Sequence, residues 1–252
     1  MPTQKFTTQL DDVEELLNLV ESITLRHPAF SYLSQRPTPG PILAGAVVLL
    51  CARFEEFVKD VVTYALEQHQ EADPNLLLWD LPEQLQVLLI SKNMTAALQA
   101  KRFGRPRSPA DRLRDGLAVA QDIVQGRINA GKAIETGGNP GPDTVADLMK
   151  LVGVAKPWAE IAKYFDARYN PPPASPELAG IAVGDLQERL RELVGLRNVV
   201  AHSGARIPSS PAEIRFNVHF TRYLASAIYH VLKEHVDAYV RSVGRIPGAW
   251  TL

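Results

Sequence analysis

One segment, residues 41–70, constrains the fold of this chain more than any other. It reads PILAGAVVLLCARFEEFVKDVVTYALEQHQ, and its apolar residues recur with the spacing of a helix. The proline at position 41 suits the first turn of such a helix. Because the first half of the segment is apolar nearly all round, we expect a long helix at the centre of the fold, covered by other helices.

Helical spacing continues through almost the whole chain of 252 residues, and we find no convincing alternating run bounded by hairpin turns. A serine cap followed by proline and, three residues on, by an acid opens two of the helices, at Ser108 and Ser210. The predicted helices cover about residues 8–26, 41–70, 82–100, 109 onward, 144–152, 158–165, 185–202 and 211–243. We therefore predict a single all-α domain over residues 1–252, with the region of about 128–180 inserted between core helices.

Composition excludes several classes of protein. The 27 Lys and Arg residues against 28 Asp and Glu residues give a net charge of −1, so only a local patch could attract nucleic acid. A single cysteine, Cys51, excludes an intramolecular disulfide and a cysteine-based zinc site. No stretch approaches the roughly 20 apolar residues of a membrane helix, and the first residues lack the apolar region of a secretory signal. We expect a cytoplasmic protein that does not bind membranes.

Several motifs that would indicate a particular cofactor or a particular type of catalysis are absent from the sequence. The chain has no phosphate-binding loop, no glycine-rich dinucleotide motif and no nucleophile elbow. Its six histidines do not form a metal-binding HExxH pair. We therefore predict neither a cofactor nor a metal site.

One segment carries the residues for a different chemistry, Leu196 to Gly204. On a helical wheel, Arg197 falls in the middle of an apolar arc, where a guanidinium needs a carboxylate, a phosphate or a wet cleft. His202 follows Asn198 by four residues and so shares its side of the helix, which we expect to end at Ser203-Gly204. These three side chains could converge on one anionic group such as a phosphodiester.

A structural explanation of the same residues is about as plausible. Arg–His spacing of this kind arises readily by chance in a chain of this composition. Arg197 would then be a core ion-pair residue, and His202 a cation at the end of a helix, where the helix dipole favours positive charge.

The run Leu196-Arg197-Asn198-Val199-Val200-Ala201-His202 resembles the Arg-x4–6-His motif of the HEPN superfamily. The segment 52–60, ARFEEFVKD, is similar to the early long helix of the RiboL-PSP-HEPN branch, whose members carry a glutamate before an aromatic residue. Asn139-Pro140-Gly141-Pro142 before a short helix is also similar to that branch. The resemblance implies a HEPN-like helical bundle with a long central helix.

The resemblance also implies a function. Many HEPN proteins are metal-independent ribonucleases that act as homodimers, with the motifs of two protomers facing one cleft. Carried over to this chain, Arg197 would bind the scissile phosphate, His202 would be the general acid or base, and Asn198 would orient the histidine or the phosphate. The RNA 2′-OH would be the nucleophile, leaving 2′,3′-cyclic phosphate ends. By resemblance, the role would be that of a toxin or phage-defence effector, with an antitoxin or defence-system protein as a further partner.

Two other functions stay open. The chain could be a catalytically silent HEPN module that binds RNA or a partner protein, or a helical scaffold in which Arg197 is ion-paired. The intact set of Arg197, Asn198 and His202 favours the enzyme, because a binding module could lose the histidine at little cost.

Glu55 is a fourth candidate for the site. It borders the apolar face of the central helix, whereas Glu56 points roughly the other way. We predict that Glu55 is a partner of Arg197 or a third polar group in the cleft. A boundary glutamate paired with Lys59 is an equally good interpretation.

A run of basic residues is the candidate RNA surface. Residues 101–114 hold six of them, namely Lys101, Arg102, Arg105, Arg107, Arg112 and Arg114. Phe103 could stack on a base there, which would add affinity to the electrostatic attraction. The alternative is a solvated loop, the usual fate of such charge runs.

Overall fold

The computed structural model describes residues 2–26, 40–81, 83–99, 101–102, 105–128, 140–166, 178, 181–203 and 210–247. Its helices are α1 Pro2–Arg26, α2 Gly40–Ala72, α3 Glu83–Leu98, α4 Pro109–Val124, α5 Pro142–Leu151, α6 Pro157–Lys163, α7 Val183–Ser203 and α8 Pro211–Ser242. A 3-10 turn, η2 (Leu78–Asp80), lies between α2 and α3. The predicted all-α class is confirmed. Within the described part, no helix is long and apolar enough to span a membrane.

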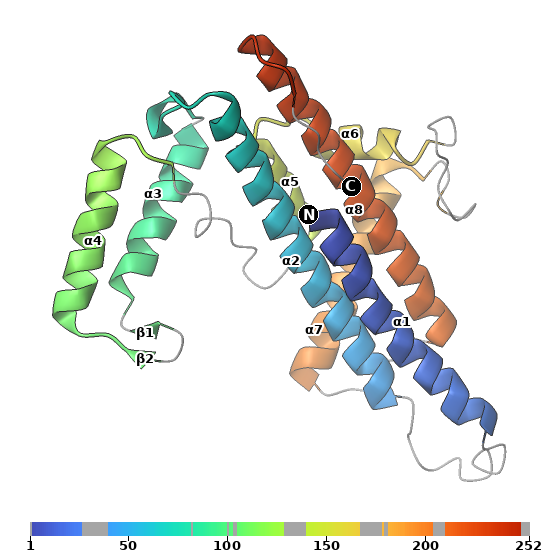
Figure 1. The fold of residues 1–252 in the computed structure, drawn as a ribbon. Helices are drawn as coiled ribbons and strands as arrows, with labels where there is room; N and C mark the ends of the chain where they lie inside the picture. Colours follow the sequence, from blue (N-terminus) through green and yellow to red (C-terminus); the bar gives the residue numbers. More distant parts are fainter. Residues whose placement is uncertain are drawn as a thin grey trace.

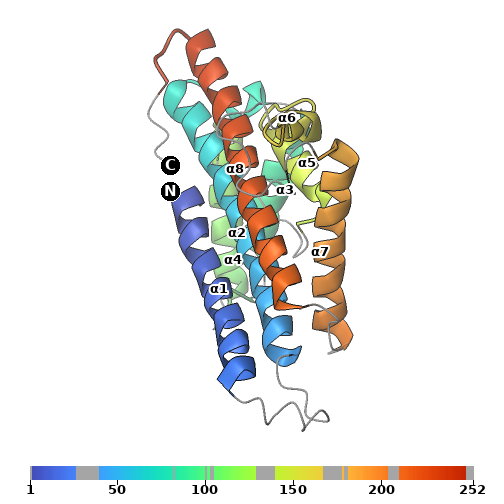
Figure 2. The same cartoon turned by 90° about the vertical axis from the view of Figure 1, so that its right-hand side faces the viewer.

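Helix α2 is the centre of the bundle, as predicted. Figures 1 and 2 show α1 and α8 running beside it, with α7 on another side. Buried residues recur along α2 at intervals of three and four, from Leu43 to Ala72. Phe54 and Phe57 meet Phe6 of α1, with ring centroids 6.4 and 5.0 Å apart. Burial on several sides is what the apolar composition of this helix demands.

Two helices begin at capping residues that can be recognised in the sequence. A third helix begins earlier than its sequence pattern indicates, because tertiary packing extends it. Ser108 and Ser210 cap α4 and α8, accepting hydrogen bonds from the backbone N–H groups of Asp111 and Glu213 at 3.1 and 3.2 Å. The predicted start of α1 at about residue 8 is wrong, because the helix begins at Pro2. Phe6 is only 2% exposed, so its packing against α2 extends α1 beyond the stretch that the sequence pattern marks.

The region 128–180 supplies α5 and α6, which pack against each other and against α7. Their buried side chains include Met149, Trp158 and Ile161. Trp158 donates its indole N–H to the carbonyl of Pro142 at 3.1 Å, which joins the two helices. Through these helices the region contributes side chains to the common core.

Helices α3 and α4 form a hairpin that projects from the bundle (Figure 1). At its tip, β1 (Lys101–Arg102) and β2 (Arg105–Pro106) pair antiparallel, with Arg102 opposite Arg105. Strands of two residues are too short to produce an alternating pattern, which is why the sequence does not predict them.

Candidate functional site

Helix α7 carries the predicted motif at the edge of the core. Leu190 and Leu193 are buried at 0% and 2% exposure, as the helical wheel requires. One turn further on, Arg197 is half-buried, and Ala201 is exposed. The apolar face of α7 therefore ends at the motif, and Arg197 lies at the boundary between the core and solvent.

Arg197 is held by its neighbour in the chain. Its Nη1 donates a hydrogen bond to the side-chain oxygen of Asn198 at 3.0 Å, and both side chains are half-buried. Among the described residues, no carboxylate lies within ion-pair distance of this guanidinium. Asn198 therefore restrains Arg197 without neutralising it, because an amide oxygen accepts a hydrogen bond but carries no net charge.

Glu55 reaches the same region from α2. The thiol of Cys51, one turn before it, lies 3.8 Å from the carbonyl oxygen of Leu193 on α7. Burial raises the pKa of Cys51 to about 12, the positive charge of Arg197 lowers it, and the negative charge of Glu55 raises it further. Since both charges act on one buried thiol, Glu55 and Arg197 lie in one neighbourhood where α2 packs on α7.

Glu55 also has the alternative partner that its sequence predicts. Its carboxylate pairs with the ammonium group of Lys59 at 2.8 Å, one turn along the same helix. The side chain of Glu55 is 15% exposed, against 36% for Lys59. A carboxylate this poorly hydrated contributes negative charge to the region even while it is paired.

His202 lies in the last turn of α7, which ends at Ser203 as predicted. Its side chain lies outside the described residues, so the convergence of His202 with Arg197 and Asn198 stays a prediction. The helical backbone does place His202 one turn after Asn198 and on the same side of α7.

The basic run divides into two parts. Lys101, Arg102 and Arg105 belong to β1 and β2, but their side chains lie outside the described residues. Arg107 is 11% exposed, pairs with Asp115 and donates to the carbonyl of Ala97 at 2.8 Å. This arginine therefore ties the end of α3 to α4, a role that a search for charge runs does not reveal. For Lys101, Arg102 and Arg105, contact with RNA stays a prediction.

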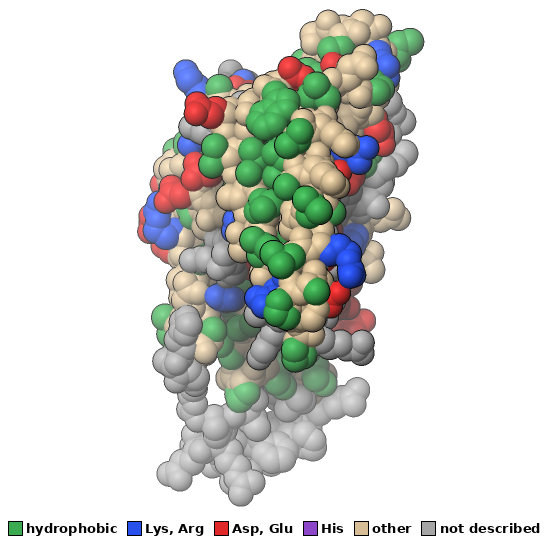
Figure 3. All heavy atoms as spheres, turned by 90° about the vertical axis from the view of Figure 1, so that its left-hand side faces the viewer, with side chains coloured by type: hydrophobic (Ala, Val, Ile, Leu, Met, Phe, Trp, Pro, Cys, Tyr) green, Lys and Arg blue, Asp and Glu red, His purple; other side chains and the backbone are tan. Residues whose placement is uncertain are grey.

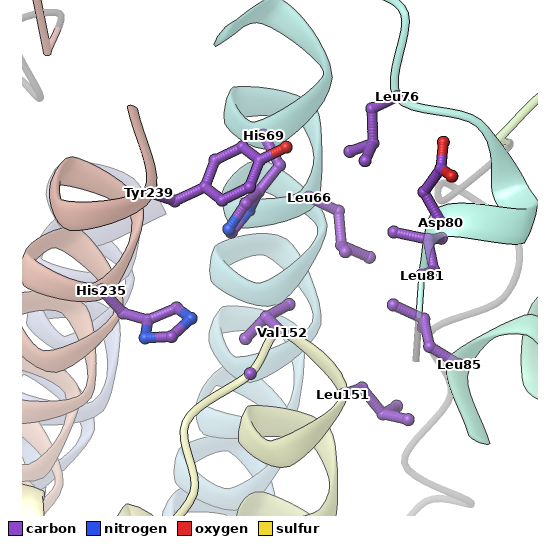
Figure 4. A pocket seen from close by; sticks show the side chains of 11 residues that line it. Leu66, His69, Leu76, Asp80, Leu81, Leu85, Leu151, Val152, His235 and Tyr239 are labelled. Carbon is purple, nitrogen blue, oxygen red and sulfur yellow. The ribbon is translucent and has the colours of Figure 1, made fainter. Parts of the chain in front are cut away.

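A cavity of about 170 Å³ lies elsewhere in the molecule, between α2, α8, the end of α5 and the segment from η2 to the start of α3 (Figure 4). His69 and His235 face each other there with ring centroids 6.1 Å apart, and Tyr239 lies 4.6 Å from the His69 ring. Burial lowers the pKa of both histidines, and Nδ1 of His69 lies 2.8 Å from the Ala65 carbonyl oxygen. Sequence reasoning missed this pair, because the two histidines are far apart in the chain.

The cavity is separate from the motif. Glu55 and His69 are 69 − 55 = 14 residues apart on α2, which corresponds to roughly 21 Å along the helix. Leucine and valine side chains make up most of the cavity wall. No group of three or more potential metal ligands is present in the described part of the chain. The cavity is therefore a mainly apolar feature that lies apart from the polar residues around Arg197.

Comparison with known proteins gives one result. Residues 8–234 match the family model of RiboL-PSP-HEPN. No curated protein and no solved structure matches the chain. The match spans both α2, with Glu55, and α7, with Arg197.

Proposed function

Because the chain belongs to the RiboL-PSP-HEPN family, we propose that it is a metal-independent endoribonuclease. Ribonuclease activity is common among HEPN proteins, and RNA binding alone is the coarser function that membership suggests. The proposed substrate is RNA, and the proposed site comprises Arg197, Asn198, His202 and Glu55.

The observation that carries the proposal is the state of Arg197. A half-buried guanidinium loses part of its hydration, so it needs a compensating anion or hydrogen bonds. In the described part of the chain it has one hydrogen bond, from Nη1 to Asn198, and no carboxylate partner. The scaffold interpretation requires an ion pair at this position. A guanidinium that is restrained but not neutralised is suited to a phosphate, which it can bind through two parallel N–H groups.

The chemistry follows from these groups and from RNA itself. The 2′-OH attacks the adjacent phosphorus, the bond from phosphorus to the 5′ oxygen breaks, and the products carry a 2′,3′-cyclic phosphate and a 5′-OH. Arg197 offsets the negative charge that develops on the phosphate oxygens. His202 transfers a proton as general acid or base, since imidazole titrates near neutral pH. Asn198 keeps the guanidinium in place, and Glu55 contributes a carboxylate beside it.

The test is incubation of the purified protein with total RNA and tRNA in EDTA, followed by analysis of the fragment ends. We expect cyclic-phosphate ends from the wild type. Arg197→Ala and His202→Ala should each reduce cleavage by about 100-fold or more. The matched control is Arg191→Ala, because Arg191 is an exposed arginine on the same helix that pairs only with Glu188 in the described structure. Far-UV circular dichroism would show that all three variants keep the helical fold.

Different outcomes separate the candidate functions. Equal cleavage by His202→Ala and wild type would remove the histidine from the mechanism. Loss of cleavage in EDTA would reject a metal-independent reaction. Binding of RNA by the wild type without cleavage, measured by gel shift, would support the silent module instead.

The biological role rests on family membership alone. We propose a toxin or phage-defence effector, which predicts that expression of the wild type arrests growth and that His202→Ala relieves the arrest. Growth unaffected by the wild type, with cleavage intact in vitro, would reject the toxin role. Homodimerisation at the motif, an antitoxin and a cytoplasmic location stay predictions.

A further inference from the structure

Exposed apolar side chains concentrate on the α3–α4 hairpin and on the η2 segment before it. Twelve large apolar residues in the described part of the chain are at least 36% exposed, and seven of them fall between residues 77 and 124. These seven are Leu77, Trp79, Val87, Leu98, Leu113, Leu117 and Val124. Figure 3 shows a column of hydrophobic side chains along the face of the molecule on which α4 lies. Scattered exposed leucines need no explanation, but a contiguous group does.

Along α4 this surface has the spacing of a coiled-coil seam. Leu113, Leu117, Ala120 and Val124 follow one another at intervals of four, three and four residues. Leu113 is 69% exposed, Leu117 62% and Val124 80%. We call Leu113, Leu117, Ala120 and Val124 the α4 seam. Its regularity is typical of a helix that packs against another helix along its length.

The partner in the same chain, α3, covers a different side of α4. A Cβ at Gly116 would lie 3.0 Å from Leu98, so Gly116 marks the side on which the two helices approach closely. Gly116 is buried, whereas its neighbours Leu113 and Leu117 are exposed. Helix α4 thus has two apolar sides, one packed on α3 and one bare in the described structure.

The hairpin is held at both ends, so the bare side is presented by a fixed element. At the base, the N–H of Leu78 donates to the carbonyl of Gly126 at 2.6 Å. At the tip, Arg107 joins the carbonyl of Ala97 to Asp115. A surface that is already ordered loses less entropy when it binds, which favours association.

The size of the surface fits a dimer. From the exposed fractions and the area of such side chains, the seven residues present roughly 700 Å² of apolar surface, where a monomer's largest patch is about 300–600 Å². A stable interface buries about 800 Å² per partner, somewhat more than half of it apolar. Together, the hairpin and the η2 segment before it therefore expose an apolar area close to that of one half of a stable interface.

The charges beside the seam favour a second copy over an oppositely charged partner. Residues 107–127 contain four arginines and three aspartates, a net charge of 4 − 3 = +1, so two copies of this segment carry charges of both signs and repel each other only weakly. A twofold interface uses the same surface twice, and a heptad seam packs well against a like seam. We propose that the α3–α4 hairpins of two chains pair through their α4 seams.

The test is sedimentation velocity from low to high micromolar concentration on the wild type and on charged variants of the seam. We expect Leu117→Glu and Leu117→Lys each to lose one association step of the wild type, with the dissociation constant of that step raised at least about 100-fold. Mixing the two variants in equal amounts should restore that step, because opposite charges then meet across the interface. The matched control is Leu19→Glu, since Leu19 is 47% exposed on α1 and lies outside the hairpin.

Several results would overturn the proposal. These are a wild type that stays monomeric over the whole range, a Leu117→Glu variant that associates to the same extent as the wild type, and a mixture that does not recover the wild-type association. A dimer that Val199→Glu breaks and Leu117→Glu does not would place the pairing at the motif on α7 instead. Leu113→Lys is a second seam variant, so a folding defect in one variant cannot decide the question.

Discussion

Replacement of Gly153 by alanine should destabilise the fold through a backbone conformation that only the folded structure reveals. Gly153 ends α5 with φ +96°. Its N–H donates to the carbonyl of Lys150 at 2.9 Å, and the N–H of Val154 donates to that of Met149 at 3.1 Å. This is the Schellman pattern, in which the residue after the helix cap adopts a positive φ and is usually glycine.

The magnitude has two parts. A side chain at positive φ costs about 1–2 kcal/mol. The new Cβ would also lie 2.6 Å from Nε2 of His235, which therefore has to move. Displacing that ring endangers its hydrogen bond to the Val152 backbone, worth about 1 kcal/mol. We expect the free energy of unfolding to fall by about 2–3 kcal/mol, and the melting temperature by roughly 5–10 °C.

The assay is urea unfolding followed by circular dichroism, with thermal melts beside it. The control is Gly195→Ala, because Gly195 lies within α7 and a Cβ there would meet nothing within 4 Å. That variant should gain about 0.5–1 kcal/mol. If both alanines stabilise the protein equally, Gly153 does not have a positive φ in the folded protein.

Three other properties can be checked on the same preparation. Burial lowers the pKa of His69 and His235 below the ordinary 6.5. As the pH falls, these histidines therefore bind protons in the unfolded chain before they do so in the folded chain. Stability should be greatest above pH 6.5 and should decline as the pH falls below 6.5; a urea midpoint that stays constant as the pH is lowered below 6.5 would contradict this. Cys51 is 3% exposed with a pKa of about 12, so thiol reagents at pH 8 should label it only in denaturant. Labelling of the native protein would refute its burial. Phe54→Ala should cost about 3–5 kcal/mol in urea unfolding. Leu19→Ala, at a 47% exposed position, should cost at most about 0.5 kcal/mol, and similar losses would place Phe54 outside the core.

Much of the fold could be predicted from the sequence, and the site only in part. The helix caps at Ser108 and Ser210, the central position of α2 and the end of α7 at Ser203 all agree with expectation. Arg197 differs from expectation, because the helical wheel placed it in the middle of the apolar arc, whereas it is half-buried and Ala201, a member of that arc, is exposed. Arg107 is different, because its charge predicted contact with RNA, while the structure uses it to join α3 to α4.

The sequence by itself determined the helices, because capping and amphipathic spacing depend on residues within a turn or two of one another. Tertiary structure decided which faces were covered. It extended α1 to Pro2, brought Glu55 and Arg197 to the same buried thiol, and set His69 beside His235. In the described part of the chain it also left Leu113, Leu117 and Val124 of the α4 seam exposed, although the seam has the same apolar spacing as a core helix. Periodicity shows that a face is apolar, but only packing between segments distant in the chain determines whether this chain or another covers it.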